Sequence, residues 1–393
     1  MIRRIAQDFT DQDLYKFSMG QVAFHQFPYP VARYRYTNRD PEKTFRPGFA
    51  KEMQTQVEMM ADLSLSDTMF DFFRAQCPWL KPTYLQWLRQ YRYKPEQVQA
   101  TQDATGRLDI TIEGPWFETI FWEVPLLFII SELDVTNPAT GERLPKAPDW
   151  KESIRRKAER LAEAGVNWID FGTRRRFDFQ TEDAVCEIMR DFAPLFRGAS
   201  NPYLAAKHNI KVFGTYAHEL VMAMQAIYGP IMCNAKAMDH WVAEYRGDLG
   251  IALTDTVTTE VFLRSFDIYY AKLFDGVRID SGVPEERGEL MVRHYESLNI
   301  DPTSKVLAFS DALTDTRAIE IANYFKGRIK TTMGIGTYLT NDVGHKPPNH
   351  VIKLVQMDVG YGFTDLVKLS DGKGKFTGPS QVIQDLLRAL KIQ

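Results

Sequence analysis

The second half of the chain carries the feature that most constrains its fold. Short β-branched segments recur from about residue 160, and most precede an amphipathic stretch such as "DTRAIEIANYFKG" or "PEERGELMVRHYESL". A strand–helix unit that repeats in this way places its strands parallel in one sheet. The seven expected strands are "VNWIDFG", "IKVFGTY", "GIALTDT", "DGVRIDSG", "KVLAFSD", "RIKTTMGIG" and "VIKLVQMDV".

Polar residues follow nearly every one of these strands. An open doubly wound sheet and a closed barrel both fit the pattern, and the polar clusters favour the barrel, whose active site lies at the carboxyl ends of its strands. We therefore expect these groups to converge on one mouth. They are Gly172-Thr173-Arg174, Gly214-Thr215, Thr254-Asp255-Thr256, Arg278-Ile279-Asp280-Ser281-Gly282, Ser310-Asp311 and Gly334-Ile335-Gly336-Thr337.

The first 130 residues differ in texture. They are rich in aromatic residues and Met, with a helical pattern in "EMQTQVEMMADLSLSDTMFDFFRAQ". The runs "YRYKPEQVQATQ" and "RLDITIEGPW" then predict a small β-containing module. A length of 393 residues fits two domains, or one large α/β domain with an elaboration.

Composition narrows the class of protein. A formal net charge of -3 gives no electrostatic reason to expect nucleic acid or an anionic membrane as a partner. Three widely spaced cysteines, without metal-ligand spacing, predict a reducing compartment with no disulfide framework and no structural zinc. The start of the sequence lacks the apolar segment of a secretory signal, and the most apolar stretch, 124–130, is too short to span a bilayer. These features predict a cytoplasmic protein.

One histidine stands where a probable strand meets a probable helix. In "GTYAHELVMA" His218 precedes Glu219 at this junction. A histidine that only packs against or caps a helix start would explain it, and so would a reactive imidazole.

A second candidate is the "VRIDSG" strand end. Arg278 and Asp280 lie two residues apart and so point to the same face of a strand. The aspartate suits two ribose hydroxyls and the arginine suits an anion, although a structural ion pair would look the same.

Two further strand ends carry candidate ligands. Gly334, Gly336 and Thr337 form a Gly-x-Gly-Thr turn that either holds a phosphate or is simply a tight turn. In "FGTRRR", Phe171 can stack on a flat ring and Arg174 can meet its carboxylate, unless this is only a basic helix start. The chain has no Walker A loop and no G-x-S-x-G motif. Together these parts indicate recognition of a phosphorylated sugar and a flat anionic ring.

The motifs, taken in order, closely resemble those of the bacterial nicotinate phosphoribosyltransferases over essentially the whole chain. They are "TDQDLYKFSM", "EGPWFETIFWEVPLL", "DFGTRRR", "GTYAHE", "VRIDSG", "FSDALT" and "GIGTYLTND". The resemblance implies an irregular α/β barrel of the type II phosphoribosyltransferases, covering 131–349. It further implies a second α/β domain built from both chain ends, residues 1–130 and about 350–393, and a homodimer with shared active sites.

The resemblance also implies an activity. Nicotinate and 5-phosphoribosyl 1-diphosphate would give nicotinate mononucleotide and diphosphate, with coupled ATP hydrolysis and with Mg²⁺ carried by the diphosphate rather than by a protein metal site. A nicotinamide or quinolinate phosphoribosyltransferase, or a binding protein without turnover, are the alternatives.

Residue by residue, the resemblance assigns His218 as the histidine phosphorylated from ATP, with Asp280 and Arg278 as its catalytic companions. It assigns the nicotinate ring to a group that includes Tyr15, which would reach it from the neighbouring subunit. The ring-binding residues are Tyr15, Phe171, Arg174, Thr215 and Arg278. The residues for the phosphoribosyl diphosphate are Asp280, Ser281, Gly282, Ser310, Asp311, Gly334, Gly336 and Thr337.

Overall fold

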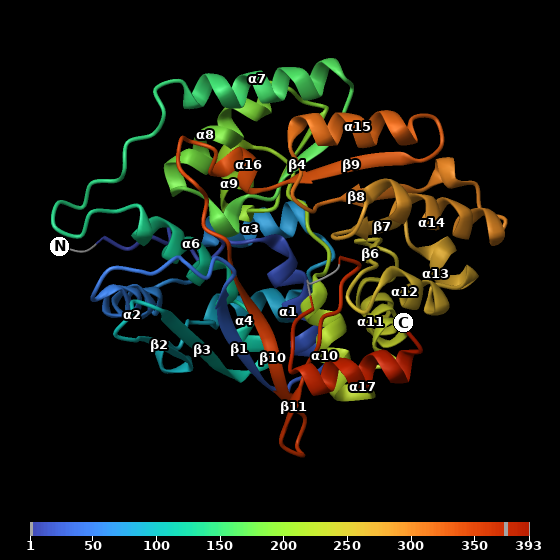
Figure 1. Ribbon diagram of the computed structural model, residues 1–393, viewed down its shortest axis with the longest axis horizontal. Helices are drawn as coiled ribbons and strands as arrows, with labels where there is room; N and C mark the ends of the chain where they lie inside the picture. The colour runs from blue at the N-terminus through green and yellow to red at the C-terminus, as the bar shows by residue number, and fades with distance from the viewer. Residues whose placement is uncertain (1–2, 373–375, 393) are drawn as a thin grey trace.

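Two β-sheets organise the chain in the computed structural model, which describes residues 3–372 and 376–392 (Figure 1). A six-stranded parallel sheet takes the middle of the chain, and a five-stranded antiparallel sheet combines segments from both ends. The expected mixture of a βα unit and a second α/β unit is confirmed. The division at residues 130 and 349 stays a prediction.

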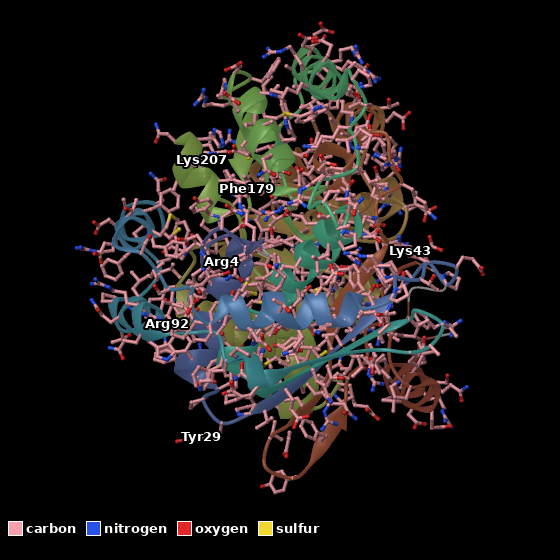
Figure 2. All side chains as sticks on the ribbon, turned by 90° about the vertical axis from the view of Figure 1, so that its left-hand side faces the viewer. Arg4, Tyr29, Lys43, Arg92, Phe179 and Lys207 are labelled. Carbon is pink, nitrogen blue, oxygen red and sulfur yellow. The ribbon has the colours of Figure 1, made fainter. Side chains whose placement is uncertain are left out.

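The elements of the antiparallel unit come from the two ends of the sequence. They are α1 (Leu14–Gln26), β1 (Val31–Asn38), α2 (Phe49–Met60), α3 (Asp67–Gln76), α4 (Pro82–Gln90), η1 (Pro95–Gln97), β2 (Val98–Gln102), β3 (Leu108–Pro115), α5 (Trp116–Thr119), α6 (Glu123–Asp134), β10 (His350–Asp358), β11 (Phe363–Asp365) and α17 (Ser380–Leu390). The sheet order is β11-β10-β1-β3-β2. In Figure 2 the 90% exposed Tyr29, between α1 and β1, projects from this half of the molecule.

The elements of the parallel unit follow one another along the chain. They are α7 (Trp150–Glu163), β4 (Trp168–Asp170), η2 (Thr173–Arg175), α8 (Phe179–Arg190), β5 (Phe196–Ala199), α9 (Pro202–His208), α10 (His218–Tyr228), α11 (Cys233–Tyr245), β6 (Ile251–Leu253), α12 (Thr259–Ser265), α13 (Ile268–Leu273), β7 (Gly276–Ile279), α14 (Pro284–Ser297), η3 (Pro302–Ser304), β8 (Val306–Phe309), α15 (Asp315–Phe325), β9 (Lys330–Ile335) and α16 (Thr337–Thr340). The sheet order is β5-β4-β9-β8-β7-β6, and Figure 1 shows α7, α14 and α15 along its outside.

The barrel is irregular where β5 and β6 face each other. The expected strand "IKVFGTY" reaches this gap only as an isolated bridge between Val212 and Ala199. Thr215 then donates its hydroxyl to the carbonyl of Ile251 at 3.1 Å, which links the segment to β6. Gly214 explains the interruption, because a Cβ there would lie 2.9 Å from the backbone nitrogen of Tyr15. Helix α1 therefore packs where a regular strand would continue.

One expected parallel strand belongs to the other sheet. "VIKLVQMDV" forms β10, which pairs antiparallel with β1 over its full length, so its assignment to the parallel sheet is wrong. Its burial alternates, with Ile352 and Leu354 buried and Lys353 half-buried between them. Such alternation is typical of an antiparallel strand with one exposed face, whereas a parallel strand is buried on both faces. The sequence analysis also missed β5.

The apolar stretch 124–130 lies within α6, and every residue of it is buried. No helix in the described part of the chain is long and apolar enough to cross a membrane.

Candidate active site

A cleft of about 180 Å³ opens where the carboxyl ends of the parallel strands face β10. The antiparallel unit supplies one wall, and the ends of β4, β7 and β8 with the start of α10 supply the other. The cleft is lined by Tyr15, Arg39, Glu123, Arg174, Arg175, Ala217, His218, Glu219, Met222, Asp280, Ser310, Asp311, Ala312, Val351, Ile352, Lys353, Leu354, Lys368 and Ser370.

Six of the residues expected at the site line this cleft: Tyr15, Arg174, His218, Asp280, Ser310 and Asp311. The others lie outside the lining, at the ends of β4, β7 and β9 or, for Thr215, just before α10. They are Phe171, Thr215, Arg278, Ser281, Gly282, Gly334, Gly336 and Thr337. The convergence is thus observed for the ends of β4, β7 and β8, and the ligand roles of all these residues stay predictions.

His218 is the first residue of α10, as its sequence pattern indicates. Its Nε2 lies 3.1 Å from Oδ2 of Asp280 and 3.9 Å from Oδ1 of Asp255. Its Nδ1 lies 2.9 Å from the hydroxyl of the buried Thr256. Burial and the nearby charge of Lys368 lower the pKa of His218 to about 4, although Asp255 and Asp280 oppose this. The imidazole is therefore neutral at pH 7 and has one nitrogen with a free electron pair.

The contact with Asp280 determines which ring nitrogen of His218 carries the free electron pair. Burial would raise the pKa of Asp280, but Arg278, His218 and Lys368 outweigh burial and hold the pKa of this carboxyl well below its usual range. Asp280 is thus a carboxylate, which only accepts hydrogen bonds. It accepts from the Ser310 hydroxyl at 2.5 Å and from Nε2 of His218, so Nδ1 carries the electron pair and accepts from Thr256.

This protonation state can be measured directly. We expect the ring resonances of His218 in ¹³C/¹⁵N-histidine-labelled protein to stay in their neutral form from about pH 8 down to about pH 5. An unperturbed histidine would titrate with a midpoint of about 6.5 over the same range. His218→Asn identifies the resonance among the seven histidines of the chain. A midpoint above about pH 6 would contradict the buried, neutral imidazole.

Three cations of the cleft wall were not found by the sequence analysis: Arg39, Lys353 and Lys368. A fourth, Arg175, belongs to the basic run of "FGTRRR". Burial and neighbouring cations lower the pKa of Lys353 to about 7 and that of Arg175 to about 10. The pKa values of Lys368 and Arg39 are also lowered, mainly by burial. Cations whose charge is this poorly compensated mark a site for a polyanion. Lys353 is a polar residue at an alternating position of β10, a pattern that an ordinary exposed strand face shares.

The three arginines of "FGTRRR" occupy different environments. Arg174 and Arg175, in the η2 turn, line the cleft. Arg176 is fully buried and pairs with Asp11, Glu132 and Glu182 at 2.7–3.1 Å. A buried cation needs such complete pairing, so Arg176 holds the N-terminal segment to α6 and α8 rather than binding a ligand.

The carboxylate that follows His218 has a structural role. Glu219 accepts hydrogen bonds from Tyr34 at 2.5 Å and Trp116 at 2.9 Å, and it forms an ion pair with Lys16. Lys16 is itself buried and also pairs with Glu123, at 2.5 Å. The start of α10 is therefore anchored to α1, β1 and α5, and through Lys16 to α6.

Close packing accounts for the glycines of the expected phosphate turn. A Cβ on Gly334 would lie 2.4 Å from the ring of Phe171, and one on Gly336 would lie 3.1 Å from the Phe171 carbonyl. Thr337 starts the four-residue helix α16. The tight-turn interpretation therefore explains both glycines without a phosphate.

Ser281 and Gly282 lie beneath the C-terminal segment. The Ser281 hydroxyl is buried, donates to Asp255, and accepts from the backbone nitrogen of Asp371 at 3.0 Å. Gly282 has a positive φ of 81°, and a Cβ there would lie 3.0 Å from the side chain of Asp371.

Tyr15 lies in the cleft of its own chain. It is 9% exposed and lines the same space as His218. The sequence analysis expects this tyrosine in the site of a neighbouring subunit, and the geometry of the single chain does not require that.

Comparison with known proteins agrees with these features. The nicotinate phosphoribosyltransferase (NAPRTase) family model matches residues 166–377, and the model of its N-terminal domain matches residues 10–131. The chain is 44% identical to a nicotinate phosphoribosyltransferase of Chromohalobacter salexigens, with 97% of each chain covered. It is 40% identical to one of Desulforapulum autotrophicum, with 98% and 99% covered.

Solved structures give the same result. The crystal structure of nicotinate phosphoribosyltransferase from Porphyromonas gingivalis matches over 100% of both chains with a TM-score of 0.94 and 40% identity. That of the Vibrio cholerae protein matches over 99% and 94% with a TM-score of 0.90 and 31% identity. The chain therefore belongs to the nicotinate phosphoribosyltransferase family, which is a family of enzymes.

Proposed function

We propose that this cleft joins nicotinate to 5-phosphoribosyl 1-diphosphate and releases nicotinate mononucleotide and diphosphate. The observation that carries the proposal is the set of weakly compensated cations around the neutral His218 and the ionised Asp280. Such a wall suits substrates that bring a carboxylate and several phosphate groups.

In the transfer step the ring nitrogen of nicotinate attacks C1 of the ribosyl group, and the bond from C1 to the diphosphate oxygen breaks. The ribosyl centre passes through an oxocarbenium-like state, as in other glycosyl transfers. Nicotinate already has a nucleophilic nitrogen, so the step needs no strong base. The protein contributes orientation and charge.

The proposed ring site combines Arg174 for the carboxylate with Tyr15 and Phe171 for the ring, and Thr215 and Arg278 complete the set given by the resemblance. Asp280, Ser310 and Asp311 would face the phosphoribosyl group, which their place in the cleft supports. Ser281, Gly282, Gly334, Gly336 and Thr337 rest on the resemblance alone.

We further propose that ATP phosphorylates His218. A new bond would form between an imidazole nitrogen and the γ-phosphorus as ADP leaves. The low pKa of His218 supports this, because a neutral ring keeps the electron pair that attacks. Thr256 now occupies the nitrogen that carries this pair, so its hydroxyl must turn away first.

Mg²⁺ fits this cleft as a companion of the diphosphate. Among the described residues no group of three His, Cys, Asp or Glu side chains could hold a metal ion alone. Asp280 and Asp311 line the cleft and could each offer an oxygen to an ion held mainly by phosphate oxygens and water. The ion would neutralise charge on the leaving diphosphate.

The substrate is tested by measuring product formation with nicotinate, nicotinamide and quinolinate in parallel. Turnover with nicotinate and little with the other two supports the proposal. A preference for nicotinamide or quinolinate would reassign the substrate, and no turnover with any of them would indicate a binding protein.

We also propose a homodimer in the cytoplasm. Three buried cysteines without disulfides, Cys77, Cys186 and Cys233, support a reducing compartment. The resemblance is the support for the dimer, and the shared active sites that it also implies are tested with mixed dimers.

Mixed dimers test whether Tyr15 is shared. If Tyr15 serves the cleft of its own chain, mixing Tyr15→Ala with Arg278→Ala subunits damages one site through each chain, and we expect no recovery of activity. If Tyr15 crosses to the partner, one site of each mixed dimer would be intact. Recovered activity in demonstrably mixed dimers would therefore contradict the placement of Tyr15 seen in the single chain.

A further inference from the structure

A short C-terminal segment, Leu366–Asp371, crosses the edge of the cleft and is called the strap below. It contributes Lys368 and Ser370 to the lining. The strap follows β11 and lies outside the named helices and strands. Its backbone is nevertheless attached at nearly every residue, which an ordinary surface loop does not need.

Lys368 itself pairs with Thr377 through two backbone hydrogen bonds, at 3.0 and 2.8 Å, and a further attachment comes from the helix that begins with His218. Gln225, two turns along α10, donates to the carbonyl of Val367 at 2.8 Å and accepts from the Val367 nitrogen at 3.0 Å. Both residues are buried, so losing this pair leaves two backbone groups unsatisfied. Gln225 therefore fixes the peptide that directly precedes Lys368.

Another attachment runs through the residue that contacts the His218 ring. Thr256 places its hydroxyl 2.9 Å from Nδ1 of His218, and its carbonyl accepts from the Leu369 nitrogen at 2.9 Å. The peptides on both sides of Lys368 are thus tied to the His218 environment.

The far end of the strap is seated on the β7 loop and α12. The carboxylate of Asp371 accepts from the backbone nitrogen and the hydroxyl of Thr259 at 2.8 and 2.6 Å. Its own nitrogen donates to Ser281, and Gly282 leaves room for its side chain. These contacts with Asp371 give a structural role to Ser281 and Gly282, which lie outside the cleft lining.

Lys368 is the charged residue that the strap places in the cleft lining. Its side chain is only 9% exposed and lies among Asp255, Asp280, Arg39 and Arg278. A lysine has a long, flexible stem, so a fixed backbone position limits where its ammonium group can reach.

We propose that the strap is a positioning element that aims Lys368 at the phosphate groups of the substrate, with Gln225 as the positioning residue that ties it to the His218 helix. This inference shares one assumption with the proposed function, namely that the substrate carries a diphosphate group. Gln225 touches no substrate and acts through Lys368.

The test uses inorganic diphosphate as the probe, with binding to the full-length protein measured by calorimetry in the presence of Mg²⁺. Gln225→Met keeps the side-chain volume and removes both hydrogen bonds, and we expect diphosphate to bind about fivefold or more weakly. Gln56→Met is the matched control. Gln56 is equally buried on a helix and holds Ile5 and Arg3 by the same pair of backbone hydrogen bonds, at 2.9 Å each.

A double-mutant cycle separates positioning from general damage. In a Lys368→Met background, Gln225→Met should weaken diphosphate binding by less than about twofold, because the cation it aims is gone. Asp371→Asn loosens the other end of the strap and should behave in the same way if Gln225→Met does not fold.

Unchanged diphosphate binding in folded Gln225→Met would overturn the proposal. So would a loss of the same size in the Gln56→Met control or in the Lys368→Met background. The measurement needs no turnover, so it stands apart from the question of which ring the enzyme accepts. A wild-type protein that binds diphosphate but does not convert nicotinate would refute the proposed substrate and leave the strap test intact.

Discussion

Replacing His218 by asparagine is expected to abolish the stimulation of transfer by ATP while a slower, ATP-independent transfer remains. Asparagine keeps a polar side chain of similar reach but has no nucleophilic nitrogen. The residues proposed to hold the ring and the ribosyl group are unchanged, so the two reactants are still brought together. Only ATP stimulation should be lost, because the substitution removes the neutral imidazole that would accept the phosphate and leaves the other cleft residues in place.

The covalent step is checked with ATP labelled at the γ-phosphate. Wild-type protein should take up label in an acid-labile, base-stable form, which is the behaviour of a phosphoramidate, and His218→Asn should take up none. His294→Asn is a suitable control, because His294 is part-buried and bonds to the Phe266 carbonyl outside the cleft. It should keep both label and stimulation.

The opposite results would identify a structural histidine. His218 also contacts Thr256 and Asp280, and if its role is purely structural, its loss loosens the start of α10 and does nothing else. In that case the variant would have a lower melting temperature and lose ATP-dependent and ATP-independent transfer alike. Full ATP stimulation in a folded His218→Asn protein would refute the phosphohistidine.

The parallel strand ends could be predicted from sequence because local rules govern them. In "VRIDSG" the alternation of a strand places Arg278 and Asp280 on one face, and both are indeed half-exposed around the buried Ile279. His218 could be found because the change from β-like to helical pattern is local as well. These signals need no knowledge of the rest of the fold.

The remaining cleft residues could not be predicted, because distant segments bring them there. Lys353 comes from a strand of the other sheet, and Lys368 comes from a strap without regular secondary structure. Arg39 follows the end of β1 and reaches the cleft only because β1 pairs with β10. Nothing within a few residues of these cations distinguishes them from surface charges.

Adjacent residues show the same limit. Arg175 and Arg176 are equivalent as letters, yet one lines the cleft and the other is buried among three carboxylates. The η2 turn ends between them, with Arg175 as its last residue and Arg176 as its C-cap. Only the positions of Asp11, Glu132 and Glu182 in the folded chain reveal this.

Replacing Asp280 by asparagine is expected to weaken binding of the phosphoribosyl substrate by roughly 1.5–3 kcal/mol, which is about tenfold to 150-fold. The carboxylate now accepts from Ser310 and His218 and lies between the charges of Arg278 and Lys368. An amide loses the charge and one acceptor, so it holds sugar hydroxyls less well. Affinity for 5-phosphoribosyl 1-diphosphate and for nicotinate is measured separately, and nicotinate binding should change less.

Asp183→Asn, which removes a carboxylate paired with Lys207 and His208 outside the cleft, should alter neither affinity. Unchanged phosphoribosyl affinity in a folded Asp280→Asn protein would instead make Asp280 the structural partner of Arg278, and the ribose would have to be held by other residues at the mouth of the cleft.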